Sequence, residues 1–427
     1  MSRIRSLFAR IVLLPMLLGG SPHAAQHHQA RSTASRDAAS RTIEGRGALA
    51  QVEIHGHSVP EPKEPSEQAP ASKPASPAPG PDSSSEVCPR GPSPLAGKCP
   101  AKAVGFNVEK LPSTIELEGG VELEGIKGYL VTVAPAVRAT YVVPDGSALP
   151  VDCTRLRRYM EQVCNEGHSS CADMRKLAEQ CETAPPTCEA LSLTSKLTGR
   201  ALRFPLYTLE EWDRLIPTRL KVNANWFDVG GVASVGDIPN YPHNVPCSDI
   251  FGLSVSEGHV VSGDNPDIVG DVRNDLDALV VRDVEADDGR RVQDLQIVEH
   301  QHIPSFRGAS AAVGGFILMK DGRVKRLSEL PSSVKGNATG ARTAIGLSQD
   351  RNTLYIMVVQ GGDRTAQMTA RQITLYLKAR GAYDVMSLDN SGSSQLVFEG
   401  EILTQKGDKD QRNNPVYRPI PNFFGIE

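Results

Sequence analysis

Short runs of alternating or β-branched residues recur along the C-terminal half of the chain and predict a sheet. The runs with the composition of strands are 129–133, 140–143, 220–227 and 354–362. Between other such runs lie the pairs Glu257-Gly258, Asp288-Gly289 and Asp321-Gly322. Each pair is a strong hairpin signal, and hairpins join antiparallel strands. We therefore expect a largely antiparallel sheet.

Helical signals occupy a smaller part of this region. Thr208 and Glu211 have the spacing of a capping box, which predicts a short helix after Thr208. Thr369 has the position of an N-cap, and Gly381 that of a helix stop. The apolar face between them consists of Ile373, Tyr376 and Leu377. Helices packed on an antiparallel sheet define an α+β fold.

Four cysteines flank two further segments of helical periodicity. Cys153 and Cys164 bound the first segment, and Cys171 and Cys181 bound the second. In an antiparallel hairpin the outer pair, Cys153 with Cys181, and the inner pair, Cys164 with Cys171, would come within bonding distance. Zinc binding is the alternative, but the gaps are wider than the two to four residues of zinc sites. We predict a disulfide-stapled helical hairpin inserted at 150–190.

The N-terminal quarter has the composition of an exported, unstructured leader. Residues 1–25 contain three arginines, an apolar run at 11–18 and small residues up to Ala25, which predict a signal peptide. An uncleaved anchor is the alternative. Residues 26–100, rich in Pro, Ala and Ser, are expected to form a disordered linker. No later run approaches the roughly 20 apolar residues of a membrane span. We expect a secreted, periplasmic or cell-envelope protein, and the even number of eight cysteines agrees.

Charge and polar clusters exclude several function classes. The net charge of −4 and the lack of a basic stripe argue against nucleic acid as a partner. The acidic stretch 264–277 lacks the pattern of a calcium loop and is interpreted as a solvated loop. His300 and His302 are expected on one polar strand face rather than as metal ligands. We predict neither a metal nor another cofactor.

One loop could carry chemistry. The expected strand 383–388 leads into Asp389-Asn390-Ser391-Gly392-Ser393-Ser394, where a core strand would present the loop. Small residues allow successive N–H groups to converge on an anion, and the serines add hydroxyl donors. The alternative is a plain β-turn in which Asp389 bonds its own backbone.

This loop and four other segments resemble one known family. The segments, in chain order, are 223–227 (NANWF), 342–346 (RTAIG), 354–362 (LYIMVVQGG), 388–394 (LDNSGSS) and 417–422 (YRPIPN). Together they resemble the phosphodiester glycosidase family, which includes the lysosomal uncovering enzyme acting on N-acetylglucosamine-1-phosphodiesters. The resemblance covers 128–427 and is interrupted by the cysteine-rich insertion.

The resemblance implies a hydrolase and names its site. Asp389 and Arg342 fall on the positions expected to be catalytic, Asp389 as nucleophile or base and Arg342 as the phosphate-binding cation. The residues expected to bind substrate are Asn223, Thr343, Gly392, Ser393, Ser394 and Arg418. The implied substrate is a glycan or sugar phosphate, and the implied reaction is cleavage of a sugar-1-phosphodiester linkage in envelope or extracellular polysaccharide.

The sequence also departs from the family pattern. Asn225, Asn390 and Ser391 replace glycines, which narrows the space for a ligand. Gln360 begins a stretch, Gln-Gly-Gly, that stands for aspartate-glycine-arginine, although Asp363 and Arg364 follow. These departures favour the alternative of a catalytically degraded glycan- or protein-binding module on the same fold. Trp226 fits a sugar-stacking and a core position equally well.

Overall fold

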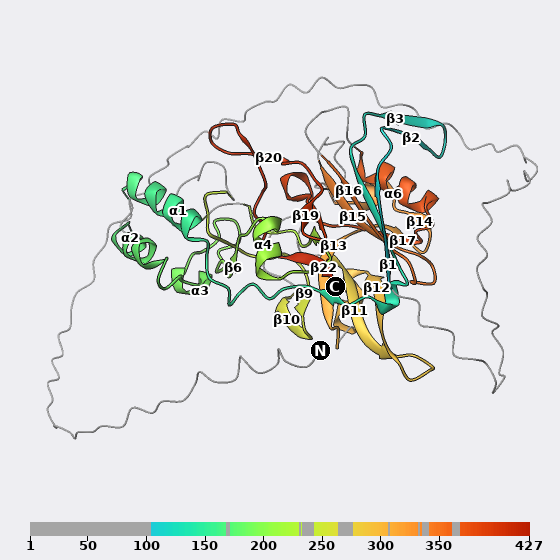
Figure 1. Ribbon diagram of the computed structural model, residues 1–427, viewed down its shortest axis with the longest axis horizontal. Coiled ribbons are helices and arrows are strands. Elements are labelled where there is room, and N and C mark those ends of the chain that lie inside the picture. The colour runs from blue at the N-terminus through green and yellow to red at the C-terminus, as the bar shows by residue number, and fades with distance from the viewer. Residues whose placement is uncertain are drawn as a thin grey trace, which may run out of the picture. The chain divides into compact units, whose positions relative to one another are not determined.

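Two antiparallel sheets form the framework of the protein (Figure 1). The computed structural model describes residues 104–167, 171–229, 232, 243–263, 276–305, 308–331, 334, 341–360 and 368–427, all within one compact unit. The predicted signal peptide, the predicted linker, the acidic residues from Asp264 to Asp275, and Asp363 with Arg364 lie outside these residues.

The larger sheet contains the predicted strands of the C-terminal half. Its order is β1 (Gly105–Lys110), β4 (Gly128–Ala134), β16 (Leu354–Val359), β15 (Arg342–Leu347), β17 (Asp384–Ser387), β13 (Ala311–Lys320), β11 (Asp277–Glu285) and β12 (Arg291–Val298). β9 (Ser254–Ser256), β10 (His259–Ser262) and β14 (Arg323–Val324) join it through hairpins. The described pairings are antiparallel, and each of the three expected hairpin turns connects neighbouring strands. The α+β prediction is confirmed.

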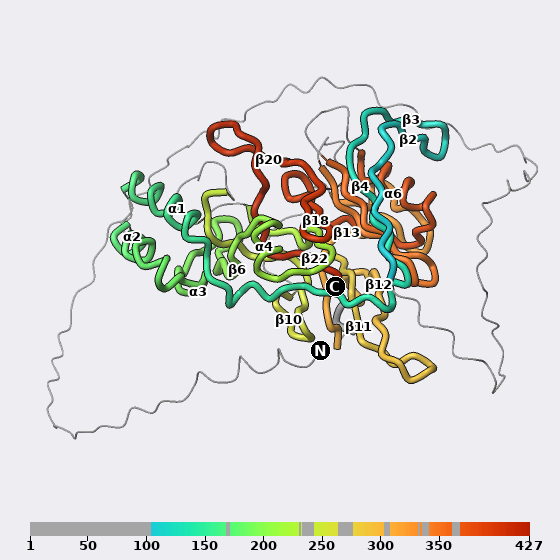
Figure 2. Tube along the Cα trace, in the orientation of Figure 1, coloured from blue at the N-terminus to red at the C-terminus, as the bar shows by residue number. Residues whose placement is uncertain are grey.

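The smaller sheet packs face to face on the larger one. Its order is β19 (Glu401–Ile402), β18 (Leu396–Phe398), β7 (Leu220–Asn223), β22 (Phe423–Ile426) and β5 (Tyr141–Val142). Figure 2 shows the C-terminal segment beside β7, although the two are far apart in sequence. Ile345 and Met386 of the large sheet share the central core with Val222 and Phe424 of the small sheet. This core fixes where β7 ends relative to β15 and β17.

Helices cover the outer faces of both sheets. α6 (Ala370–Ala379) packs on the large sheet, where Ile373 and Leu377 meet apolar residues of β15 and β16. Thr369 caps it, and Gly381, with φ of +103°, follows its end, as predicted. α4 (Leu209–Leu215) packs on the small sheet through Trp212. Its expected capping box is present.

The cysteine-rich insertion has its own small core. α1 (Cys153–Asn165), α2 (Cys171–Gln180) and α3 (Cys188–Leu191) surround buried apolar residues such as Leu156 and Tyr159. The disulfides Cys153–Cys181 and Cys164–Cys171 confirm the predicted pairing. A further disulfide, Cys188–Cys247, joins the insertion to β8 (Cys247–Ser248), which pairs with β6 (Phe204–Pro205).

The remaining elements are short. β2 (Thr114–Leu117) pairs with β3 (Val121–Glu124), and β20 (Asp408–Lys409) pairs with β21 (Pro415–Val416). The expectation that His300 and His302 lie on a strand face is wrong, because both belong to a 3₁₀ helix, η2 (His300–Ser305). In the part of the chain that is described, no helix combines the length and apolarity needed to cross a membrane.

Candidate functional site

The loop that follows β17 is held by backbone hydrogen bonds to two other strands. Leu388 N donates to Thr343 O at 3.0 Å, and Asp389 N donates to the carbonyl of Ala224, just after β7, at 3.1 Å. Ser391 N donates to the carbonyl of Ala341, just before β15, at 2.7 Å. The loop therefore lies where β7 and β17 end and β15 begins, and these hydrogen bonds fix its backbone.

The Asn223 side chain ties these three strands together. Its Nδ2 donates to Asp389 O at 2.7 Å. Its Oδ1 accepts from Thr343 Oγ1 at 2.7 Å and from Gln395 N at 3.2 Å. All three contacts are buried, so Asn223 and Thr343 use their polar atoms to hold the loop.

Asp389 is a buried carboxylate with a shifted pKa. Its Oδ1 accepts from Asn390 N at 2.8 Å, and only 7% of the residue is exposed. Burial raises the pKa of Asp389 to about 6, against the opposing influence of the nearby Ser393 hydroxyl, Arg418 and the Asn390 amide. A carboxylate that ionises near neutrality suits general acid–base or nucleophilic chemistry.

Arg418 and Asp408 form an ion pair that lies against Gly392. Arg418 Nε donates to Asp408 Oδ2 at 2.8 Å. A Cβ atom on Gly392 would stand 2.7 Å from Asp408 Oδ2 and 2.9 Å from Arg418 Nε. A side chain at this position would displace Asp408 or Arg418, so the glycine allows the loop to approach the ion pair. Burial acts to raise the pKa of Asp408, but the contacts with His243 and Arg418 outweigh it and hold that pKa below its ordinary value.

Two polar atoms that follow Asp389 closely in the chain lack a partner among the described residues. They are Ser394 Oγ and Gln395 Oε1, and both are buried. The Ser393 hydroxyl differs, because it interacts with the Asp389 carboxylate and lowers its pKa. The other end of the Gln395 amide is occupied, because Nε2 donates to Arg418 O at 2.7 Å. Buried polar groups are normally hydrogen-bonded, and unsatisfied ones beside a reactive group are a signature of a ligand site.

Arg342 lies at the first position of β15, next to the loop. It is buried, and its Nε donates to Met368 O, just before α6, at 3.0 Å. Burial lowers the pKa of its guanidinium. On the neighbouring strand, Gln360 follows β16, and its Nε2 donates to Leu403 O at 3.3 Å. Its amide thus bonds the backbone where the family pattern has a carboxylate.

The substituted glycine positions have different structural explanations. Asn225 bonds the carbonyls of Phe251 and Leu253 at 3.1 and 2.9 Å, so its amide fastens two segments. Asn390 has φ of −123°, which any residue adopts, and its Oδ1 accepts from Thr343 N at 3.3 Å. Ser391 differs, because its φ of +63° is in the left-handed region that favours glycine. Only this third substitution imposes backbone strain.

Trp226, the residue with two interpretations, is partly buried. Its ring meets Phe316 edge to face at a centroid distance of 5.5 Å and packs against the core beneath α6. Its Nε1 is buried without a hydrogen-bond partner in the described part of the chain. The ring is therefore a core contact, with one donor that is still unused.

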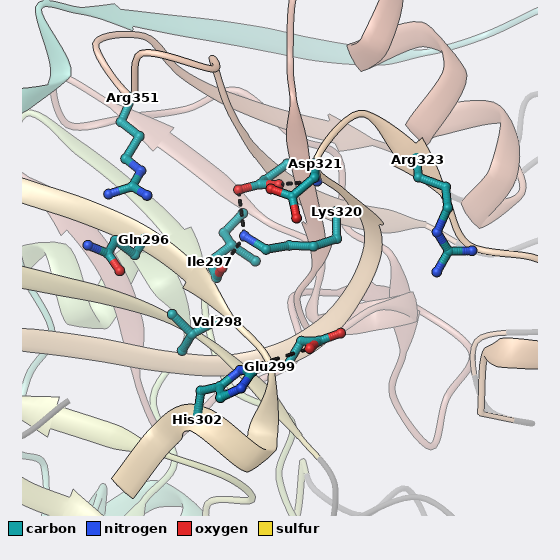
Figure 3. A pocket seen from close by; sticks show the side chains of 10 residues that line it. Gln296, Ile297, Val298, Glu299, His302, Lys320, Asp321, Arg323 and Arg351 are labelled. Atoms are coloured by element: carbon teal, nitrogen blue, oxygen red, sulfur yellow. Dashed lines mark hydrogen bonds and ion pairs between the residues drawn. The ribbon is translucent and has the colours of Figure 1, made fainter. Parts of the chain in front are cut away.

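A pocket of about 600 Å³ lies at the other end of β17 (Figure 3). Lys320, labelled near the centre of the view, contacts Asp384 Oδ2 through its Nζ at 2.8 Å. Arg351 pairs with Asp294 and Arg323 with Glu329. Asp384 begins β17, whereas the Asp389 loop follows its end. The charged groups of this pocket thus satisfy one another away from the candidate site.

The fold and the loop define an α+β protein with a buried carboxylate beside an arginine. Residues 251–427 match the phosphodiester glycosidase family, which confirms the resemblance seen in the sequence. No curated protein sequence matches the chain significantly.

Three solved structures illustrate the structural similarity. The zebrafish N-acetylglucosamine-1-phosphodiester alpha-N-acetylglucosaminidase catalytic domain, auto-inhibited by pro-peptide, is 14% identical, with a TM-score of 0.44 over 77% of this chain and 84% of that one. A hypothetical protein from Synechocystis is 11% identical, with a TM-score of 0.38 over 75% and 62%. A putative exported protein from Burkholderia pseudomallei is 11% identical, with a TM-score of 0.33 over 76% and 97%.

Two site residues were missed by sequence reasoning. Asp408 lies in a charged turn that reads as ordinary surface, and His243 lies in a loop without a motif. His243 Nε2 is 3.2 Å from Asp408 Oδ2. The one usable signal was Arg418, because an arginine in a site is commonly held by a carboxylate, and acidic residues precede it at Asp408 and Asp410.

Proposed function

We propose that this protein hydrolyses a sugar-1-phosphodiester linkage, with Asp389 as the reacting carboxylate. The observation that carries the proposal is the buried Asp389, with its pKa raised to about 6, beside Arg418, the Ser393 hydroxyl and the unpartnered hydroxyl of Ser394. The family match over residues 251–427 supports the reaction class.

The chemistry of the substrate explains this set of groups. Cleavage breaks the bond between the anomeric carbon and the phosphate oxygen, and the phosphate monoester leaves with the bonding electrons. Because that leaving group is already a stable anion, it needs cations more than a proton donor. Water supplies the hydroxyl that ends on the sugar. Asp389 either attacks the anomeric carbon first or takes a proton from that water.

The cationic groups are assigned by position. The positive charge of Arg418 lowers the pKa of Asp389. Only Nε of Arg418 is bound to Asp408, so its terminal nitrogens can bind a phosphate oxygen. Arg342, at the start of β15, is proposed as a second cation, although in this structure its Nε donates to Met368 O. Ser393 and Ser394 donate hydroxyl hydrogen bonds to sugar or phosphate oxygens. Asn223 and Thr343 keep the loop in place through the bonds described above.

Location and substrate source complete the proposal. Three disulfides among the described residues are typical of an oxidising compartment, which supports export. Envelope or extracellular polysaccharide with sugar-phosphate links is the substrate that such a protein would meet.

Turnover assays test the proposal. Purified protein is incubated with an α-N-acetylglucosamine-1-phosphodiester and a panel of other sugar phosphodiesters, alongside Asp389→Ala, Arg342→Ala and Arg418→Ala. Release of free sugar that Asp389→Ala abolishes supports the enzyme. Saturable binding of a glycan without turnover of any substrate would instead support a binding module on this fold.

A further inference from the structure

Arg418 belongs to a cluster of three ionisable side chains, together with Asp408 and His243. Asp408 Oδ2 accepts from Arg418 Nε at 2.8 Å and lies 3.2 Å from His243 Nε2. Asp408 Oδ1 is also bound, because Lys409 N donates to it at 3.0 Å. The side chains of His243, Asp408 and Arg418 are only 10%, 26% and 20% exposed. These contacts restrict the rotation of the Asp408 carboxylate.

These contacts also orient the Arg418 guanidinium. Its Nε donates to Asp408, and its two terminal nitrogens bond no described residue. The guanidinium lies on Gly392, since a Cβ there would stand 3.0 Å from Arg418 Cζ. The guanidinium therefore lies against the loop that contains Ser393 and Ser394. Such an edge binds two oxygens of an anion at once.

The insertion contacts both segments that carry these residues. Cys188–Cys247 anchors the chain shortly after His243, with a Cα separation of 5.8 Å. A surface pocket of about 300 Å³ brings Asn244 and Gln411 together with residues of α1. The charged residues that line this pocket are Arg158 and Glu161 of α1, and Glu166 just after it.

We propose that His243 and Asp408 are positioning residues for an anion subsite: they fix Arg418 so that its terminal nitrogens bind a phosphate oxygen. The identity of the anion as phosphate rests on the proposed function. The subsite itself is testable by binding alone, so that absence of hydrolysis would count against the function and leave the subsite standing.

Binding of inorganic sulfate tests the role of His243. His243→Ala should weaken sulfate binding roughly three- to tenfold, because Asp408 loses its contact with Nε2. His243→Gln, whose amide nitrogen can still donate to Asp408, should restore much of the affinity, and His302→Gln, in the other pocket, should leave it unchanged. An unchanged affinity in His243→Ala, or no sulfate binding by the wild type, would overturn the proposal.

Asp408→Glu tests positioning separately. This change keeps the negative charge but moves it by about one methylene, which displaces Arg418 while the electrostatics are preserved. Sulfate affinity should fall roughly three- to tenfold, with the urea midpoint unchanged. In the turnover assay KM should rise more than kcat falls. Sulfate affinity equal to that of the wild type would show that Asp408 does not direct the arginine.

Discussion

At the residue scale, Asp389 is a buried carboxyl that ionises, and its ionisation lowers the free energy of unfolding. A carboxyl whose pKa is raised in the folded state stabilises the fold below its unfolded pKa and loses that contribution as the pH rises through its folded pKa. For Asp389 the two values are 3.8 and about 6. The loss therefore occurs between about pH 4 and pH 6 and amounts to about 3 kcal/mol.

Asp389→Asn should consequently be more stable than the wild type at neutral pH. The amide keeps the oxygen that accepts from Asn390 N but carries no charge. We expect a gain approaching about 3 kcal/mol at pH 8 that disappears near pH 4. Urea unfolding at several pH values measures it. Equal stability of the two proteins at pH 8 would mean that the carboxylate is not destabilised by burial.

Gly392 is a second residue whose chemistry follows from contact distances. Gly392→Ala would place a methyl group 2.7 Å from Asp408 Oδ2, which forces the Asp408–Arg418 pair away from the loop. We expect a loss of about 1–3 kcal/mol in stability and reduced anion binding. Gly263→Ala is the control, because its nearest neighbour is Val260 Cγ1 at 3.8 Å. Similar behaviour of the two variants would refute the close contact.

At the element scale, Asn223 explains how three strands meet at one loop. Asn223→Ala would leave the Asp389 carbonyl, the Thr343 hydroxyl and the Gln395 amide without a buried partner. We expect a loss of about 3 kcal/mol in the free energy of unfolding. Asn107→Ala, on an exposed strand position, should change it by less than about 0.5 kcal/mol. Chemical denaturation of both variants would distinguish them. Comparable losses in the free energy of unfolding would contradict the view that Asn223 holds the three strands together.

Elements were predictable from sequence where their signals are local. Asp321-Gly322 defines its hairpin by its own backbone preference, and Thr369 defines the start of α6 by its own side chain. The pairing of Cys153 with Cys181 followed from helical periodicity alone. By contrast, two alternating histidines look alike in a strand and in a 3₁₀ turn, so His300 and His302 were misassigned.

Candidate site residues were predictable only where a motif carries them. Asp389 and Arg418 stand in recognisable segments, and the charge of Arg418 lowers the pKa of the buried Asp389. The partnership of Asp408 with His243 depends on how β20 and the segment before β8 pack together. Such long-range packing leaves no periodic or compositional trace in the chain.

At the scale of the whole molecule, the disulfides differ in how much chain they close. Cys188–Cys247 spans 59 residues and joins the insertion to the sheet domain, whereas Cys164–Cys171 spans 7 within the insertion. Longer closed loops restrict the unfolded chain more. Replacing both cysteines of the long pair by serine should cost about 4 kcal/mol, and replacing the short pair about 2 kcal/mol.

Thermal unfolding of the two double variants measures this order. We also expect the long-pair variant to weaken sulfate binding, because it releases the segment that carries His243. The short-pair variant, whose disulfide closes the tip of the helical hairpin, should bind sulfate as the wild type does. A reversed order of stability would show that the insertion is not fastened to the domain through Cys247.

The pH dependence of sugar-1-phosphodiester hydrolysis tests the central assignment most directly. If ionised Asp389 is the reacting group, kcat/KM rises about tenfold per pH unit below about pH 6, levels off above it, and is abolished by Asp389→Asn. Hydrolysis that Asp389→Asn leaves at the wild-type rate, with an unchanged pH profile, would contradict the assignment.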